Sequence, residues 1–113
     1  MKARLEKLKN KPFAFECMDL LKKNRVSMED IWKLTDANYC KTHFNAVKPI
    51  LKQIGNVASQ SEIYDNTAQP RFYGEVWQYQ NHNFLITNYW YGPNTNHIDN
   101  RTPFLIWVLA HCG

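Results

Sequence analysis

The sequence predicts an α+β fold in which helices come first and a β-hairpin and an apolar C-terminal helix follow. Three observations predict it. Residues 1–55 carry helix-spaced apolar residues between capping signals, residues 71–91 are rich in aromatic and β-branched residues, and residues 103–112 form an apolar run. With 113 residues, the chain is expected to form a single domain, residues 1–113, with a basic helical part (1–55) and an aromatic part (71–113).

The first long helix is expected to follow Pro12, which interrupts the chain after a charged N-terminal stretch. Its apolar residues recur at i, i+4, i+7 and i+8, which places them on one face: Phe13, Cys17, Leu20 and Leu21. Three cations stand at its end, where positive charge complements the helix dipole: Lys22, Lys23 and Arg25.

Two shorter helices are expected next. Ser27, with Asp30 three residues later, is typical of a helix start, and Met28, Ile31 and Trp32 supply a buried side. Thr35 or Asp36 caps the following helix, whose apolar residues are expected to face the core: Cys40, Phe44 and Val47. Pro49 ends or kinks that helix, or begins another short turn that Gly55 stops.

The second half predicts a hairpin and a final helix. Residues 71–79 and 84–91 have strand composition, and the four residues "QNHN" between them form a turn. Thr102 and Pro103 are typical of the N-cap and first residue of a helix, so the apolar run after them is expected to be helical. A buried strand is the alternative, because "FLIWVL" is apolar on both faces.

Charge and cysteine content narrow the expected partners. Residues 1–55 hold twelve Lys and Arg against six Asp and Glu, whereas residues 56–113 hold two against four, so the net charge of +4 comes from the helical part. Such a basic half favours an anionic partner, although lysines that merely solvate helices are the alternative. Three cysteines, no long apolar run and a charged N-terminus predict a cytoplasmic protein without a membrane partner.

The segments "SMEDIWKL" and "DANYCKTHFNAV" have the order of a helix-turn-helix, with the second as the recognition helix. One of its faces carries residues that pair with base edges: Asn38, Lys41, Thr42 and Asn45. Contacts to phosphate are expected from Lys22, Lys23, Arg25, Lys48 and Lys52. With the hairpin as a wing, the order resembles a winged helix in topology and predicts a small nucleic-acid-binding module, with duplex DNA as the expected ligand. A three-helix packing unit without nucleic acid is the alternative. The hairpin is also poor in basic residues for a DNA-binding wing, because only Arg71 borders it.

Three consecutive aromatic residues give a second functional hypothesis. At least one ring among Tyr89, Trp90 and Tyr91 is expected to be exposed. Exposed rings stack on unpaired bases or anchor protein interfaces. The alternative function is therefore a protein-interaction module, a small inhibitor or adaptor that docks through the aromatic hairpin.

Enzymatic and metal sites have little support. Cys40 and His43 have the spacing of a zinc-ligand pair, but the adjacent His111 and Cys112 make a poor second pair. No residues mark an oxyanion hole, and with four glycines there is no Gly-rich phosphate loop. We therefore expect no catalytic site, no metal and no small-molecule cofactor.

Overall fold

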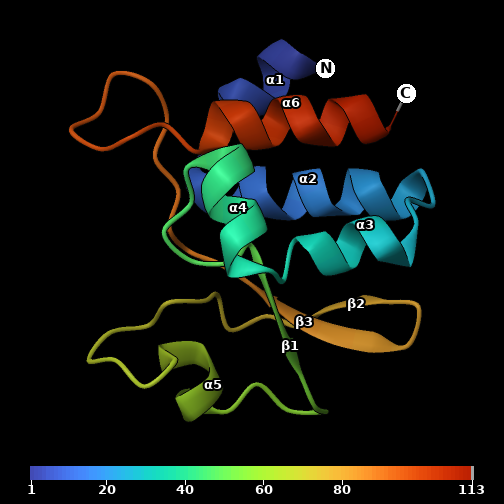
Figure 1. Cartoon of the computed structure of the whole chain (residues 1–113), viewed down its shortest axis with the longest axis vertical. Helices are drawn as coiled ribbons and strands as arrows, with labels where there is room; N and C mark the ends of the chain where they lie inside the picture. The colour runs from blue at the N-terminus through green and yellow to red at the C-terminus, as the bar shows by residue number, and fades with distance from the viewer. Residues whose placement is uncertain (113) are drawn as a thin grey trace.

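The computed structural model describes residues 1–112 and confirms the α+β class, with a layer of helices against one face of an antiparallel sheet (Figure 1). Within these residues, the helices are α1 (Lys2–Glu6), α2 (Asn10–Lys23), α3 (Met28–Lys33), α4 (Ala37–Phe44), α5 (Gln60–Tyr64) and α6 (Arg101–His111). The strands are β1 (Leu51–Ile54), β2 (Trp77–Tyr79) and β3 (His82–Ile86). Residue 113, the last of the predicted domain, lies outside the described part.

The predicted helix starts are confirmed at α3 and α4. The Ser27 hydroxyl accepts a hydrogen bond from the Asp30 backbone N–H at 3.2 Å, and the Asp36 carboxylate accepts one from the Tyr39 N–H at 3.0 Å. Helix α2 begins at Asn10, earlier than predicted, because a proline in the first turn lacks only an N–H that the helix does not use. Its Phe13, Cys17 and Leu21 are buried as predicted.

The end of α4 differs from the prediction. The helix stops at Phe44, and Asn45 adopts the left-handed conformation with φ 60°. The Ala46 N–H then donates to the Cys40 carbonyl, which closes the helix. Val47 therefore leaves the helix and is 76% exposed, instead of facing the core.

The segment after Pro49 is also corrected, because residues 51–54 form strand β1 rather than a helical turn. This strand pairs with β3, with Leu51 opposite Ile86 and Ile54 opposite Asn83. Pairing with a distant strand overrides the local helical pattern.

The predicted hairpin is confirmed, and β3 lies in the centre of a sheet with the order β1-β3-β2. Its turn is shorter than predicted. It consists of Gln80 and Asn81, with φ of 47° and 68°, as a two-residue hairpin turn of this hand requires. Helices α3 and α4 follow one another across a short turn, so the helix-turn-helix order is present. The winged-helix likeness stays a prediction.

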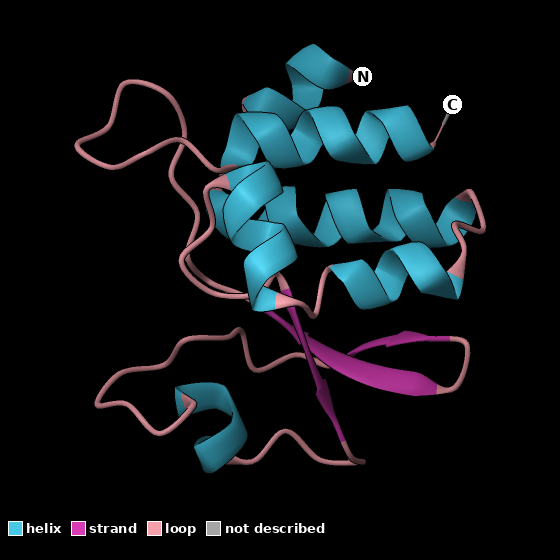
Figure 2. Cartoon of the chain, viewed as in Figure 1, coloured by secondary structure: helices cyan, strands magenta, loops and turns pink. Residues whose placement is uncertain are grey.

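Alternate residues of β3 face two different cores. Phe84 and Ile86 pack into the large core beneath the helices, whereas Leu85 faces a small cluster with Ile54 and Phe72. Ile63 of α5 packs against this second cluster. Figure 2 shows the resulting layers, with α5 on the side of the sheet opposite the other helices.

The C-terminal segment is a helix, which settles the choice between helix and strand. It begins at Arg101, after Asn100, rather than at the predicted Thr102 cap. The Asp99 carboxylate instead accepts a hydrogen bond from the Thr102 N–H at 2.9 Å, and Pro103 lies in the first turn. None of the helices within residues 1–112 has the length and apolar character that crossing a bilayer requires.

The hairpin turn provides a test of the fold. The left-handed conformation that Gln80 adopts costs most residues about 1–2 kcal/mol of stability. Gly and Asn tolerate this conformation better. We expect Gln80→Asn to raise the free energy of unfolding by about 0.5–1 kcal/mol in urea denaturation. The matched control is Gln78→Asn in β2, where Asn is disfavoured and no gain is expected. Equal gains in both variants would contradict the turn geometry.

Candidate functional site

The polar face predicted for the recognition helix is exposed to solvent. Its members are Asn38, Lys41, Thr42 and Asn45. The first three lie on α4, and Asn45 is the left-handed residue that ends it. Lys41 makes no ion pair within residues 1–112. The structure thus presents these side chains together, as predicted.

The cations at the end of α2 lie elsewhere. Lys22, Lys23 and Arg25 are exposed, and none has an ion-pair partner in the described chain. Figure 1 shows their turn, between α2 and α3, at the side of the molecule opposite the loop of residues 92–99. The ammonium group of Lys22 lies 5.4 Å from the centre of the Trp77 ring. These cations therefore do not share a surface with that loop.

The two remaining predicted phosphate contacts are engaged within the protein. Lys52 Nζ lies 3.0 Å from one Asp65 carboxylate oxygen, and Lys48 Nζ lies 3.5 Å from the other. Lys52 also donates to the Glu62 carbonyl at 3.0 Å. The two lysines thus attach α5 and the residue after it to the sheet, and their charge is balanced locally.

The aromatic segment is partly corrected. Trp90, predicted at an interface, is 2% exposed, and its indole N–H donates to the Thr87 carbonyl at 2.7 Å. Its ring packs at 5.5 Å from Phe13 and is not accessible for docking. Tyr89 and Tyr91 on either side are half-exposed, so they are the members of this segment that a ligand can reach.

A buried amide holds this segment in place. Asn100 is 3% exposed, and its Oδ1 accepts from the Tyr91 N–H at 2.8 Å while its Nδ2 donates to the Tyr89 carbonyl at 2.9 Å. The Asn100 N–H also donates to the Tyr91 carbonyl, and Asn10 donates to that of Trp90. These bonds close the base of the loop formed by residues 92–99.

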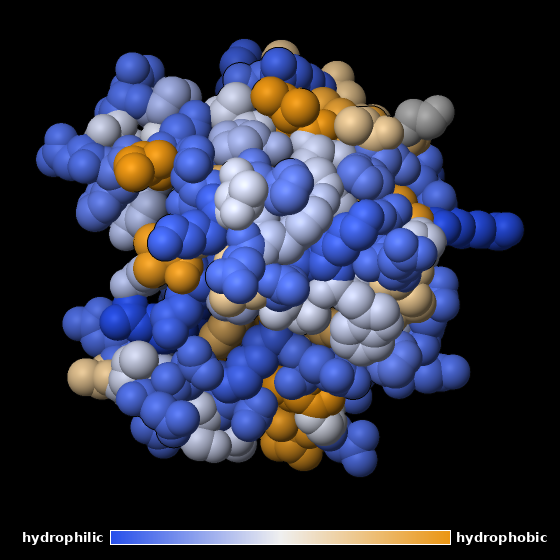
Figure 3. Space-filling view, viewed as in Figure 1, coloured by the Kyte–Doolittle hydropathy of each residue, from blue (hydrophilic) through white to orange (hydrophobic). Residues whose placement is uncertain are grey.

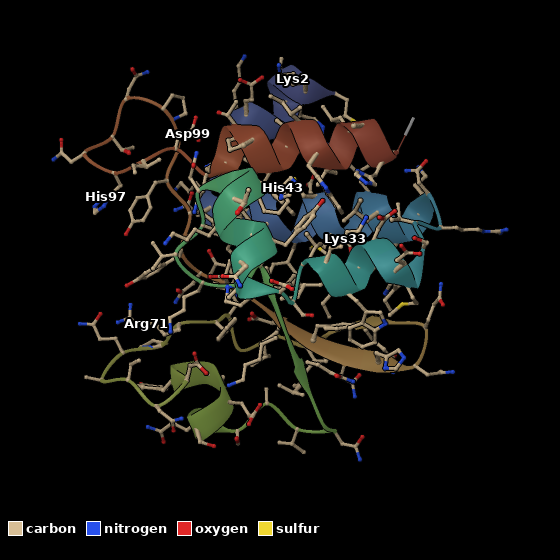
Figure 4. All side chains as sticks on the ribbon, viewed as in Figure 1. Lys2, Lys33, His43, Arg71, His97 and Asp99 are labelled. Atoms are coloured by element: carbon tan, nitrogen blue, oxygen red, sulfur yellow. The ribbon has the colours of Figure 1, made fainter. Side chains whose placement is uncertain are left out.

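Four planar groups form a row beside this loop. The Arg71 guanidinium lies 4.9 Å from the centre of the Tyr89 ring, and the Tyr89 and Tyr91 centroids are 6.2 Å apart. The His97 ring stacks on Tyr91 at 3.9 Å with 25° between the planes. Figure 4 shows Arg71 and His97 on the same side of the molecule. We call these four residues the planar row.

Lys41 and Asn45 of the α4 polar face and the three rings of the planar row border one depression. A cavity of about 440 Å³ is lined by Lys41, Asn45, Ala46, Val47 and Ile98. A second, of about 280 Å³, shares three of these residues and is lined by Asn45, Val47, Tyr89, Tyr91, Asn96, His97, Ile98 and Asn100. The Asn45 amide also donates to the Asp99 carbonyl at 3.4 Å, which joins the two sides. We call the combined depression the α4–loop groove.

The groove has apolar as well as polar walls. Val47 and Ile98 are 76% and 73% exposed and both line the larger cavity. Figure 3 shows small apolar patches among hydrophilic atoms on the side where this loop lies. Sequence reasoning missed His97, Ile98 and the role of Arg71, because the loop has no periodicity that would place its side chains.

Cys40 and His43, the pair with zinc-ligand spacing, have different surroundings: the thiol is buried and the imidazole is exposed. The Cys40 thiol donates to the Leu34 carbonyl at 3.3 Å, and burial raises its pKa to about 11. His43 faces outward and stacks on Tyr39 at 3.9 Å. Across residues 1–112, no three His, Cys, Asp or Glu side chains are grouped so as to hold a metal ion.

Comparison with known proteins gives no relative: no family model, no curated protein and no solved structure matches the chain. The groove is therefore interpreted from its own chemistry. It combines amide groups, aromatic and imidazole rings, the cations Lys41 and Arg71, and two exposed apolar side chains.

The Asn100 amide provides a test of how the groove is built. Asn100→Ala leaves the Tyr91 N–H and the Tyr89 carbonyl without partners, and each orphaned buried group costs about 1–3 kcal/mol. We expect the free energy of unfolding to fall by about 2–4 kcal/mol in urea denaturation. Asn96→Ala is the control, since Asn96 is exposed in the same loop. An equal loss in the control would contradict the role of Asn100.

The lysines around Asp65 predict a dependence of stability on pH. The hydrogen bond from Lys52, followed by the charge of Lys52 and the bond from Lys48, lowers the pKa of Asp65. A carboxylate with a lowered folded-state pKa stabilises the fold above its unfolded-state pKa, and this contribution is lost as the pH falls through the folded-state pKa. We expect stability to fall from about pH 5 to pH 2, with a smaller fall in Asp65→Asn.

Urea denaturation at several pH values measures this difference. Glu6→Gln, which removes an exposed carboxylate without an ion pair in the described chain, is the control and should leave the profile unchanged. If Asp65→Asn has the same profile as the wild type, the coupling of Asp65 to the two lysines is absent.

Proposed function

We propose that the chain is a small nucleic-acid-binding module and that the α4–loop groove is its binding surface. The observation that supports the proposal is that two members of the α4 polar face, Lys41 and Asn45, line the same groove as the three rings of the planar row. Nucleic acids offer phosphates, base edges and base faces. The groove offers a partner for each of these three.

Base edges are matched by the amides. Asn45 lines the groove, and Asn38 lies on the same helix face outside its two cavities; both amides present donors and acceptors, and such side chains pair bidentately with adenine. Thr42, on the same face, accepts or donates. These contacts would give preference for particular bases, whereas the rings bind any base.

Phosphates are matched by cations that have no internal ion pair. Lys41 lines the groove, and Arg71 lies next to it against the Tyr89 ring, where its Nε donates to the Thr67 hydroxyl at 3.2 Å. Neither cation has a carboxylate partner in the part of the chain described. Lys22, Lys23 and Arg25 are available to a longer ligand that continues around the molecule. Lys48 and Lys52 contribute less, because Asp65 and Glu62 balance their charges.

Titration with salt tests the proposal. We expect labelled oligonucleotides to bind at low salt and to bind more weakly as salt rises, because binding to phosphates displaces counterions. Lys41→Ala should weaken binding and reduce the slope of log K against log salt by about 0.7–0.9, the contribution of one phosphate contact. Lys2→Ala is the control: Lys2 is exposed on α1, away from the groove (Figure 4).

Two outcomes would contradict this proposal. One is the absence of binding to duplex and single-stranded oligonucleotides at low salt. The other is binding that Lys41→Ala and Lys2→Ala weaken equally, which would indicate diffuse attraction by the net charge of +4 rather than a site.

A protein partner is the second candidate function, and one observation favours it. Val47 and Ile98 expose most of their apolar surface on the same cavity, next to Tyr91. Exposed apolar side chains beside an aromatic ring are typical of a protein interface. The partner would be a protein with an apolar side chain that inserts between Val47 and Ile98.

The double variant Val47→Thr and Ile98→Thr separates the two functions. Both side chains are exposed, so the fold should be retained. Loss of a specific protein partner, together with undetectable nucleic-acid binding by the wild type, would favour the protein interface. Unchanged association with that partner would remove this candidate.

A further inference from the structure

We infer that the α4–loop groove takes unpaired bases, so that the ligand is a single-stranded nucleic acid or an unpaired loop rather than a duplex. This inference rests on the proposed function and names its substrate class. The planar row supports it, because reading base edges with the α4 face alone would not require these rings.

The planar row offers two stacking surfaces, the Tyr91–His97 pair and the Arg71–Tyr89 pair, and the Tyr89 and Tyr91 rings between them are inclined at 58° to each other. Tyr91 and His97 already stack face to face at 3.9 Å, so the outer face of the exposed His97 continues the stack into solvent. The Arg71 guanidinium extends the row at the other end, 4.9 Å from the centre of the Tyr89 ring. Unpaired bases stack on aromatic rings and on guanidinium planes, and each base stacked on a ring contributes about 1–3 kcal/mol.

A duplex would use little of this platform, because its base faces are already stacked on one another. Recognition in the major groove requires a helix that enters the groove freely. Here, α4 has eight residues, and the loop of residues 92–99 stands beside its C-terminal end, where Asn45 bonds to the Asp99 carbonyl. The loop therefore occupies space beside Asn45, one of the residues that would have to reach base edges in a major groove.

The charges beside the groove also match a single strand. Lys41 lines the groove and Arg71 lies next to it against the Tyr89 ring, so two cations are available to a flexible backbone that follows the groove. The nearby carboxylate of Asp99 accepts the Thr102 N–H at 2.9 Å and is thereby directed to the start of α6. Asn45 and Asn96 line the smaller cavity, and their amides offer donors and acceptors to the edge of a base.

The contribution of the rings to binding can be tested by substitutions in two similar ring stacks, one in the groove and one outside it. His97→Ala removes the exposed end of the row, and Tyr91→Leu keeps apolar packing while it removes the aromatic face. His43→Ala is the control, because His43 stacks on Tyr39 at the same 3.9 Å, outside both cavities of the groove. Circular dichroism and urea denaturation show whether each variant is folded.

The measurement is fluorescence anisotropy with labelled single-stranded DNA, single-stranded RNA and the corresponding DNA duplex, all at low salt. We expect a single strand to bind more tightly than the duplex. His97→Ala and Tyr91→Leu should each weaken single-strand binding by about 5- to 150-fold, which corresponds to 1–3 kcal/mol of stacking. His43→Ala should change it less than twofold, an order-of-magnitude bound for a site without stacking.

The outcomes separate this inference from the proposed function. Tighter duplex binding that depends on Lys41 but not on His97 or Tyr91 would overturn the inference and leave the proposed function standing. Single-strand binding that folded His97→Ala and Tyr91→Leu leave unchanged would also overturn it. Undetectable binding of all three nucleic acids would overturn both.

Discussion

The Asn100 side chain follows the loop of residues 92–99 and bonds with both of its ends to the segment before that loop, and the groove depends on this closure. Its amide bonds to the Tyr91 N–H and the Tyr89 carbonyl from a position that is 3% exposed. A buried amide with both ends satisfied is worth more than a solvated one, because any movement leaves polar groups without partners. Asn100 also precedes α6, so the loop is fixed to the helix layer. The planar row is therefore placed by the core, although its rings lie at the surface.

Trp90 determines which side chains of this segment face the core and which face the solvent. Its ring enters the core between Phe13 and Phe104, at 5.5 and 5.1 Å between centroids. With the middle ring of the three inside, Tyr89 and Tyr91 remain on the outer side, where a ligand can reach them. Phe104 also packs on Phe44 at 5.3 Å, which connects the same core to α4. One aromatic cluster thus sets the position of both walls of the groove.

Local signals in the sequence were sufficient for the helices and the hairpin, but not for the groove. The caps at Ser27 and Asp36 and the strand composition around β3 act over a few residues, so they can be identified without tertiary information. Strand β1 depends on pairing with β3, whose partner residues lie 29 to 35 positions further along the chain, and its local pattern resembled a helix. The burial of Trp90 and the stack of His97 on Tyr91 likewise depend on distant contacts. The polar face of α4 was predictable because helical periodicity alone defines it.

The distribution of charge decides what kind of binding the groove can support. Of the basic residues in the helical part, Lys48 and Lys52 are tied to Asp65, Arg4 to Glu16 and Lys11 to Glu75, so the net charge of +4 is not concentrated at the groove. Lys41 and Arg71 remain beside it. A single strand that contacts two cations releases few counterions, and its affinity should depend only weakly on salt, with a slope of about 1–2. Stacking on uncharged faces is much less sensitive to salt. Under the proposed function, the rings rather than the lysines would therefore supply most of the affinity.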